Sequence, residues 1–420
     1  MTVNSDKGKS AGQLRNERET RIMDAIRMKV PDRVPIICGF GYFPAKAQGI
    51  PCSAAYYDYE TWYDAYKKTL PDYPADMIFH QPFTPGKALE ILNPRQMRWP
   101  GFNAPANHGH QAIEVDFMQA DEYDDYLYDA SDFNMRLMMS RVSENMEGLK
   151  DLPKLSDLTG HMGATALAMA FSAPDTKKAV MTLIEAGEEY RKWTDKQAAF
   201  MQLLEDCGFP PYFQGAALPP FDIVSHSMRG MTGTMQDMFR QPDKVLEACD
   251  KILEITLARP FGPPSPLGHT RIFMTNTRGS DDFMSTKHFD KFYWPTMKKL
   301  IHGLIERDAT PCMFFEGNFT SRLEYLLDFP KGSMLVRLDT TDIKRAKEVL
   351  KDHLCIQGNV PSSLLQVATV DQVKDYCKDL IDTIGKDGGF ILSPRSSTDE
   401  ANPANLKAMI DFTQEYGVYR

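Results

Sequence analysis

Residues 334–361 read MLVRLDTTDIKRAKEVLKDHLCIQGNVP, and this stretch decides the fold. An apolar run at Met334–Leu338 leads into a helical pattern over 341–350, and a second apolar run follows at Leu354–Gln357. Two short apolar runs joined by a helix are typical of parallel strands. The same unit recurs, with runs at Arg271–Thr275, Pro311–Phe315 and Phe390–Ser393 and helical patterns over 285–307, 371–384 and 402–416. The carboxyl-terminal half therefore predicts an α/β fold with a parallel sheet.

The amino-terminal half is less regular. We expect a polar leader over 1–19 and one domain over 20–420, opening with a helix at Glu19–Met28. Strands are predicted at Val34–Cys38, Asp76–His80 and near Tyr212–Gly215, with helices over 176–206 and 235–257. Residues 84–130 are rich in Pro, Asn, Gly and Asp, so they predict a long insertion or lid after the second strand.

Alternating strands and helices fit either an open sheet or a (β/α)8 barrel. No G-x-G-x-x-G follows a strand and no G-x4-G-K-[ST] is present, so the barrel is favoured. Barrel enzymes carry their chemistry at the carboxyl ends of the strands. The residues to inspect there are Gly39–Tyr42, His80–Gln81, Gln214–Gly215, Asn276–Arg278, Glu316–Asn318, Asp339, Gly358–Asn359 and Arg395–Ser397.

Composition excludes several classes of partner. The chain has 420 residues, 42% of them hydrophobic, and a formal net charge of -9, so nothing favours nucleic acid or an anionic membrane. No apolar run of membrane-spanning length and no signal-peptide core is present, which predicts a cytoplasmic protein. The seven cysteines never occur as C-x2-C, so reduced, buried thiols are expected.

Several segments resemble the uroporphyrinogen decarboxylase superfamily across nearly the whole chain. They begin with Arg21–Arg27 followed by Pro31–Pro35, which is similar to the entry helix and first strand of that family. More specific are three carboxyl-terminal segments that resemble its last two strands and final helix: Ile356–Pro361, Gly388–Pro394 and Asn402–Met409. The resemblance implies a (β/α)8 barrel.

Two departures point to a branch within that superfamily. Decarboxylases of the family grip a carboxylate-ringed substrate with arginines after the first strand and an aspartate after the second, but this chain has Gly39–Lys46 without arginine, and then His80–Gln81. The thiol-methylating enzymes hold zinc with an H-x-C before a Gly-Asn and a cysteine after the last strand. Here Phe314, Glu316 and Ser396 stand at those places. A carboxylate and a hydroxyl replace soft ligands poorly, so no zinc is expected there.

What remains resembles the sister enzymes that transfer a methyl group from a small donor, such as a methoxylated aromatic, to the cobalt of a corrinoid. The implied partner is a separate small corrinoid protein, which carries the cobalamin-type cofactor. The sequence fixes neither the donor, nor the direction of transfer, nor whether the protein is a homodimer. Two alternatives stay open, namely a tetrapyrrole decarboxylase and a non-catalytic corrinoid- or tetrapyrrole-binding protein.

The predicted catalytic residues are Glu316, Asp339 and His80. Glu316 ends an apolar strand, where an ionisable group is costly unless it is paired or functional, and it suits a general acid; an ion pair with Arg322 or Arg337 is the structural alternative. Asp339 follows the next strand, and the helix cap there is assigned to Thr341 or Asp342 instead.

The remaining candidates bind substrate or corrinoid in this interpretation. Arginine at a strand end grips carboxylates but equally makes surface ion pairs, and asparagine after glycine equally closes turns. The candidates are Gly41, Tyr42, Asn276, Arg278, Asn318, Asn359, Arg395 and Ser396. His108 and His110 form an H-x-H in the predicted lid, for which a metal role is the weaker interpretation.

Overall fold

The structure is a computed structural model that describes residues 8–80 and 84–419. Its parallel strands are β1 (Ile37–Gly41), β2 (Met77–His80), β5 (Gly215–Ala216), β6 (Thr270–Asn276), β7 (Ala309–Phe315), β8 (Leu335–Leu338), β9 (Cys355–Val360) and β10 (Phe390–Pro394). Each lies at or within a few residues of a predicted apolar run.

The strands follow the order of a (β/α)8 barrel. A six-stranded sheet runs β10-β9-β8-β7-β6-β5, and β1 pairs with β2. The two sheets meet where the Leu392 N–H donates to the Pro35 carbonyl at 2.9 Å, next to a parallel bridge between Ile36 and Leu392. The predicted fold class is confirmed.

The ring is open between β2 and β5, because no backbone pairing joins these two strands within the described residues. Aromatic side chains cross this gap. The Phe79 ring lies 5.2 Å from that of Tyr212 and 6.1 Å from that of Phe273. Side-chain packing therefore brings the two edges together where backbone hydrogen bonds do not.

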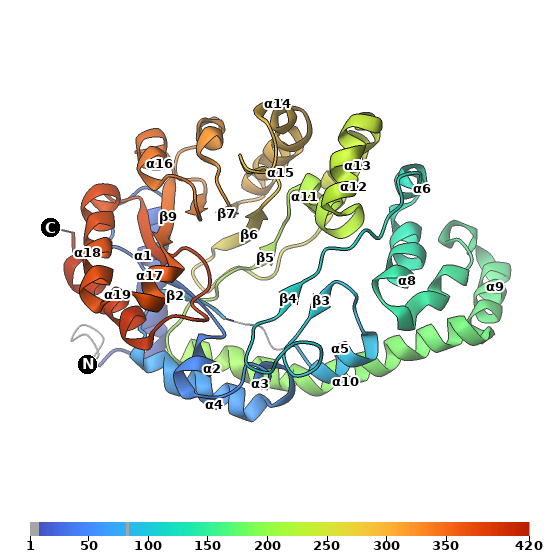
Figure 1. Cartoon of the computed structure of the whole chain (residues 1–420), viewed down its shortest axis with the longest axis horizontal. Coiled ribbons are helices and arrows are strands. Elements are labelled where there is room, and N and C mark those ends of the chain that lie inside the picture. Colours follow the sequence, from blue (N-terminus) through green and yellow to red (C-terminus); the bar gives the residue numbers. More distant parts are fainter. Residues whose placement is uncertain (1–7, 81–83, 420) are drawn as a thin grey trace.

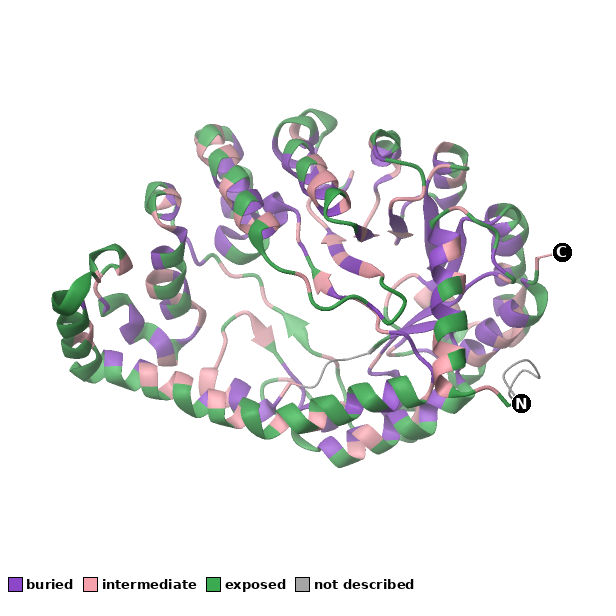
Figure 2. Cartoon of the chain, turned by 180° about the vertical axis from the view of Figure 1, so that it is seen from behind, coloured by how far each residue is buried: buried purple, intermediate pink, exposed green. Residues whose placement is uncertain are grey.

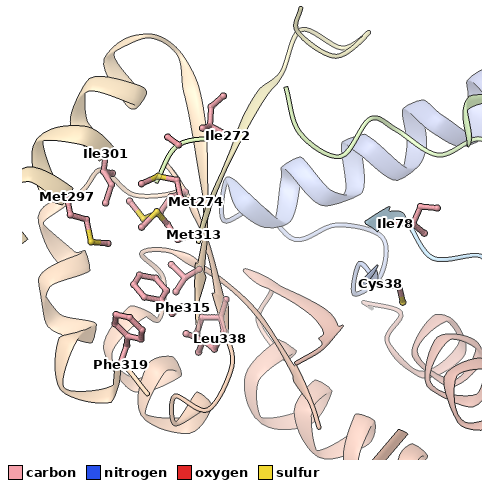
Figure 3. Close-up of a cluster of buried hydrophobic side chains, with 14 of the residues drawn as sticks. Cys38, Ile78, Ile272, Met274, Met297, Ile301, Met313, Phe315, Phe319 and Leu338 are labelled. Carbon is pink, nitrogen blue, oxygen red and sulfur yellow. The ribbon is translucent and has the colours of Figure 1, made fainter. Parts of the chain in front are cut away.

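A layer of helices covers the outside of the sheet (Figure 1). Its members are α11 (Pro220–Ile223), α12 (Gly230–Arg240), α13 (Pro242–Ala258), α14 (Thr286–His288), α15 (Trp294–Glu306), α16 (Ile343–Leu350), α17 (Ser362–Val367), α18 (Val370–Leu380) and α19 (Pro403–Tyr416). Met274 and Met313 pack toward Met297 and Ile301 of α15 (Figure 3). Alternate strand residues thus build the core between sheet and helices.

The insertion after β2 is larger and more helical than the irregular 84–130 segment expected from sequence. It extends to β5 and contains an antiparallel pair of short strands, β3 (Met97–Arg98) and β4 (Gln111–Ala112). Its helices are α5 (Gly86–Leu92), α6 (Tyr123–Tyr128), α7 (Ala130–Asp132), α8 (Met139–Val142), α9 (Gly160–Ser172) and α10 (Pro174–Asp206). Figure 1 shows α10 running along most of the lower edge of the molecule to α9 at one end. The short helices α2 (Phe43–Gln48), α3 (Ala54–Tyr57) and α4 (Tyr59–Thr69) lie on the same side.

The polar leader is the second correction, since α1 (Ala11–Ile26) begins well before Glu19. Ser10 and Gln13 form a capping box that satisfies the first free backbone N–H groups of this helix. The helix buries Ile22, Met23 and Ile26 against strand residues. Figure 2 shows both buried and exposed residues along α1, the helix that follows the N label. It therefore closes one end of the barrel. The first residues of the predicted leader lie outside the described part of the chain.

No helix among the described residues is long and apolar enough to cross a lipid bilayer.

Candidate active site

Strand alternation determines which side chains point into the barrel. Cys312, Leu335, Cys355 and Ile391 share a buried cluster with α1, so they form the floor of the interior. Two and four residues further along each strand, side chains point the same way. The upper layers therefore contain Phe314 and Glu316, Arg337 and Asp339, Gln357, and Ser393 and Arg395.

Two predicted carboxyls meet at the top of this interior. The Asp339 Oδ2 accepts the Gly317 N–H at 3.0 Å, which ties the loop carrying Glu316 to the end of β8. Asp339 Oδ1 also lies 3.8 Å from the Nε of Arg395, beyond β10. Asp342 caps α16, as the sequence predicts, and leaves Asp339 free for these contacts.

Glu316 differs from its neighbour in its surroundings. Burial raises the pKa of the Glu316 carboxyl, the nearby Asp339 raises it further, and Arg337 and Arg278 oppose the shift. Within the described chain, Glu316 has no cationic partner inside 4.0 Å, and Arg322 pairs instead with Asp281. Of these two adjacent carboxyls, one is ion-paired and the other has a raised pKa. In such a pair the first tends to stay a carboxylate, and the second can hold a proton and donate it.

A cation and an amide lie below the carboxyls. The Arg337 guanidinium stacks 4.3 Å from the centroid of the Phe314 ring and donates to the Arg395 carbonyl at 3.1 Å. Its Nε atom and the Nε2 atom of Gln357 are buried without a hydrogen-bond partner among the described residues. Buried donors normally find a partner. The Nε of Arg337 is therefore available to a ligand in the interior, whereas the Gln357 side chain also interacts with the hydroxyl of Tyr212.

The opposite wall is aromatic. The ring of Phe213 stacks on that of Phe273 at 4.9 Å, and Phe79 and Tyr212 continue the wall across the open edge. Phe79 is 40% exposed although it lies in a strand, so this part of the interior is accessible. Aromatic faces on one side and polar groups on the other suit a flat molecule with a polar substituent.

Asn276 does not lie with the site. Asn276 lies two residues after Met274, so the two side chains are on the same face of β6. The Asn276 side chain is fully buried, and its amide donates to the carbonyls of Met274 and Phe314. Because side chains alternate along β6, Asn276 faces the helical layer, and Thr275 and Thr277 take the inward positions. Asn276 and Glu316 therefore meet only through their backbones, because the Glu316 N–H donates to the Asn276 carbonyl at 3.0 Å. Their side chains do not converge.

The loop after β6 is held by a buried aspartate that sequence reasoning missed. Asp222 of α11 accepts the N–H groups of Thr277 and Arg278, each at 3.0 Å, and the Tyr293 hydroxyl at 3.1 Å. Burial raises the pKa of Asp222 to about 6 despite these donors. Asp222 thus positions Arg278, which stacks on Phe283 and pairs with Glu114 at 3.3 Å.

His226 contacts the same loop through both of its ring nitrogens, and these contacts predict its protonation state. A guanidinium only donates, so the His226 Nδ1 accepts from Arg278 at 3.2 Å and the Nε2 carries the proton that faces Thr277 Oγ1 at 2.5 Å. Burial, followed by the positive charge of Arg278, lowers the pKa of His226 to about 4. We expect nitrogen-15 NMR to show a neutral Nε2–H imidazole at pH 6, where a free histidine is largely charged. A ring that titrates near 6.5 would contradict this geometry.

Tyr42 and Gly41 lie in a separate cluster beyond β1. The Tyr42 hydroxyl lies 2.8 Å from the Tyr56 hydroxyl and 3.0 Å from Nδ1 of His110, and the Tyr42 N–H donates to Asp399 at 2.7 Å. Gly41 has φ +49° and a Cβ there would lie 2.0 Å from an Asp399 oxygen. This position therefore requires glycine, and His110 is a hydrogen-bonded histidine of the insertion.

Three other predicted residues are engaged locally. Asn318 Oδ1 accepts from the N–H and hydroxyl of Thr320, so it closes a turn. Asn359 contacts the Asp339 carbonyl and the Tyr376 hydroxyl of α18, each at 3.4 Å. Ser396 shares a 2.7 Å hydrogen bond with Ser362 at the edge of a cavity of about 310 Å³.

His80 is the last residue of β2, and its backbone pairs with Gly41, which places it at the same end of the barrel. Gln81 lies outside the described residues. Within residues 8–80 and 84–419, no group of three or more His, Cys, Asp or Glu side chains is arranged to hold a metal ion.

Sequence reasoning missed two interior residues, Arg337 and Gln357, as parts of the site. A signal existed for both. Each is a polar residue inside an otherwise apolar strand, two positions before a predicted site residue. Counting back from Asp339 with a period of two places Arg337 on the inner face, and Gln357 takes the paired position in the next strand.

Comparisons with known proteins agree with this architecture. Residues 213–416, from the approach to β5 through α19, match the family model of uroporphyrinogen decarboxylase (URO-D). The solved structure of a methyltransferase from Methanosarcina mazei has the same fold, with a TM-score of 0.56 at 15% identity over 95% of this chain and 98% of that one. A search of curated proteins returns no match. Residues 213–416 thus match the uroporphyrinogen decarboxylase family, and the chain as a whole shares the fold of a solved methyltransferase.

Proposed function

We propose that the protein is a methyltransferase that moves a methyl group from a small donor to the cobalt of a corrinoid carried by a separate protein. The observation that carries the proposal is the pair of carboxyls at the barrel mouth, of which Glu316 has a raised pKa and Asp339 is held by Gly317 and Arg395. The fold that the chain shares with a solved methyltransferase supports it.

The donor is assigned to the class of methoxylated aromatics. The wall of Phe79, Phe213 and Phe273 suits a flat ring, and the inward nitrogen atoms of Arg337 and Gln357 suit a polar substituent such as a carboxylate. The same donors fit the amide groups around a corrin ring.

Glu316 acts as the proton donor in this mechanism. As the methyl leaves an ether, the carbon–oxygen bond breaks and its electron pair stays on oxygen, which Glu316 protonates to give a phenol. The corrinoid supplies the nucleophile that takes the methyl group. The carboxylate left on Glu316 is stabilised by the charges of Arg337 and Arg278, which already favour it. Asp339 keeps the loop of Glu316 in place.

The decarboxylase alternative is less favoured by the surroundings of β1. The loop after this strand offers no arginine, and the carboxylate of Asp399 lies against Gly41 and Tyr42. A substrate ringed with carboxylates would be repelled there rather than held.

A spectroscopic assay tests the proposal. The protein is mixed with a reduced corrinoid protein and a methoxylated benzoate, and the cobalt(I) absorption band is followed. We expect conversion to methylcobalt(III) with release of one phenol per methyl group. Turnover of a porphyrinogen without any change at cobalt would contradict the proposal and favour the decarboxylase.

We expect the protein to hold no stoichiometric zinc at Phe314, Glu316 and Ser396, the positions where the thiol-methylating enzymes of the superfamily bind zinc. Phe314 offers no ligand and stacks against Arg337, and Ser396 is hydrogen-bonded to Ser362, which leaves Glu316 alone. Elemental analysis of the purified protein is the measurement. One tightly held zinc that is lost in Glu316→Gln would overturn this prediction.

A further inference from the structure

A second cavity lies between the insertion and the helical layer of the barrel. It has a volume of about 290 Å³ and is lined by residues from α6, α8, α11 and α13 and from the loops at Gln96 and Phe117. It shares only His226 with the residues described at the end of β6. A cavity of about 150 Å³ already accommodates benzene in another protein, so this one has room for a substituted single ring.

The walls are apolar. Tyr126, Met138, Met228 and Ile252 are all at most 6% exposed and line the cavity together with Val142 and Ile255. Methionines adapt to ligands of irregular shape because their side chains are flexible and polarizable. A mainly apolar molecule therefore fits most of this space. The charged residue among the lining residues, Arg259, is itself exposed.

Two polar atoms in these walls are buried without a partner. They are the Oε1 of Gln96 and the Oγ1 of Thr256, and the Thr256 side chain is 7% exposed. An amide oxygen only accepts, while a threonine hydroxyl both donates and accepts. Leaving such atoms unpaired costs about 1–3 kcal/mol each. A ligand with a hydroxyl group would satisfy the amide oxygen by donating and the threonine by accepting.

We propose that this cavity binds a small, uncharged, mainly apolar molecule that carries a hydroxyl group, with the ring among the methionines and the hydroxyl at Gln96 and Thr256. The site is distinct from the mouth at Glu316 and does not depend on methyl transfer. Because one wall comes from the insertion and the other from α11 and α13, such a ligand joins the two parts of the chain.

Phenol and its methyl ether, anisole, test the proposal as a matched pair. Both fill the cavity, but only phenol donates a hydrogen bond. With methyl-carbon-13 methionine in the full chain, we expect phenol to shift the methyl signals of Met138, Met139 and Met228 and to leave that of Met297 in the core unchanged. Anisole should bind about ten-fold more weakly, since it lacks the donor for Gln96.

Variants locate the hydrogen bonds. Gln96→Met should weaken phenol binding several-fold and leave anisole binding nearly unchanged, because only phenol donates to Gln96. Thr256→Val should weaken the binding of both ligands, because the oxygen of each accepts from the Thr256 hydroxyl, whereas Thr182→Val, in α10 and outside the cavity lining, should change neither. The assignment would be overturned if the unaltered protein bound phenol and anisole with equal affinity, or if only methionines outside the cavity shifted. Because this measurement uses the unaltered protein, it does not depend on whether the variants fold. Such a result would leave the methyl-transfer proposal untouched.

Discussion

Replacing Glu316 by glutamine is expected to lower turnover of a methoxylated donor by about 100-fold, while donor binding stays nearly intact. The amide keeps the shape of the side chain and loses the acidic proton. Protonation of the leaving oxygen then depends on water, and the barrier rises by about 3 kcal/mol if the donor contributes what general acids ordinarily do. Single-turnover formation of methylcobalt(III) measures the chemical step, and a titration of the donor measures binding.

The raised pKa of Glu316 also predicts the direction in which activity changes with pH. In the proposed mechanism the active form of Glu316 is the protonated one, and burial and Asp339 raise the pKa of this carboxyl. Activity should therefore be present below the raised pKa and decline as pH increases through it. Asp339→Asn removes the negative charge that contributes to this shift, so the decline should move to lower pH. A role of Asp339 that is only structural would reduce the rate without moving the profile.

Glu324→Gln is the matched control for the same change of side chain. Glu324 lies a short distance further along the chain, pairs with Arg345 at the surface and contacts none of the site residues. Its variant should keep full turnover. Unchanged turnover in a folded Glu316→Gln variant would assign the proton donor to another group.

The strands could be predicted because their signal is local. Parallel strands covered on both faces are short apolar runs, and those at 311–315, 334–338 and 390–393 lie within β7, β8 and β10 or beside their ends. The more specific segments of the family resemblance lie in the same carboxyl-terminal half and are confirmed by the match over 213–416, whereas the similarity at Arg21–Pro35 lies outside that match. Prediction was weaker after β2, where the insertion packs on the barrel through contacts distant in sequence, such as Tyr123 with Asp237.

The candidate site was predicted in part for a related reason. Strand ends identified Glu316, Asp339 and Arg395, which lie together. A position at a strand end does not determine whether a side chain points into the barrel or toward the helices, however. Because side chains alternate along β6, the buried Asn276 side chain points toward the helices. Asp222 and His226 come from α11 and the π-helical turn after it, and only the tertiary fold brings them to the loop after β6.

The largest effect on stability is expected at Glu19, inside the segment that its polar sequence suggested to be a leader. Glu19 of α1 is fully buried, and its Oε1 lies 2.7 Å from the guanidinium of Arg271 on β6, which is 1% exposed. Arg271 also donates to the carbonyls of Tyr212 and Pro211. The pair thus connects the helix that closes the barrel floor to β6 and to the segment before β5.

Glu19→Leu should lower the free energy of unfolding by about 3–5 kcal/mol, because it leaves the Arg271 cation buried without a counter-charge. Most domains have about 5–15 kcal/mol in total, so this is a large share. The double variant Glu19→Leu, Arg271→Met removes both charges and fills the space with apolar groups, and it should recover much of the loss. Urea denaturation of the single and double variants measures both values. If the double variant were as unstable as the two single losses added together, the two side chains would not be coupled, and α1 would be held to the floor by Ile22, Met23 and Ile26 alone.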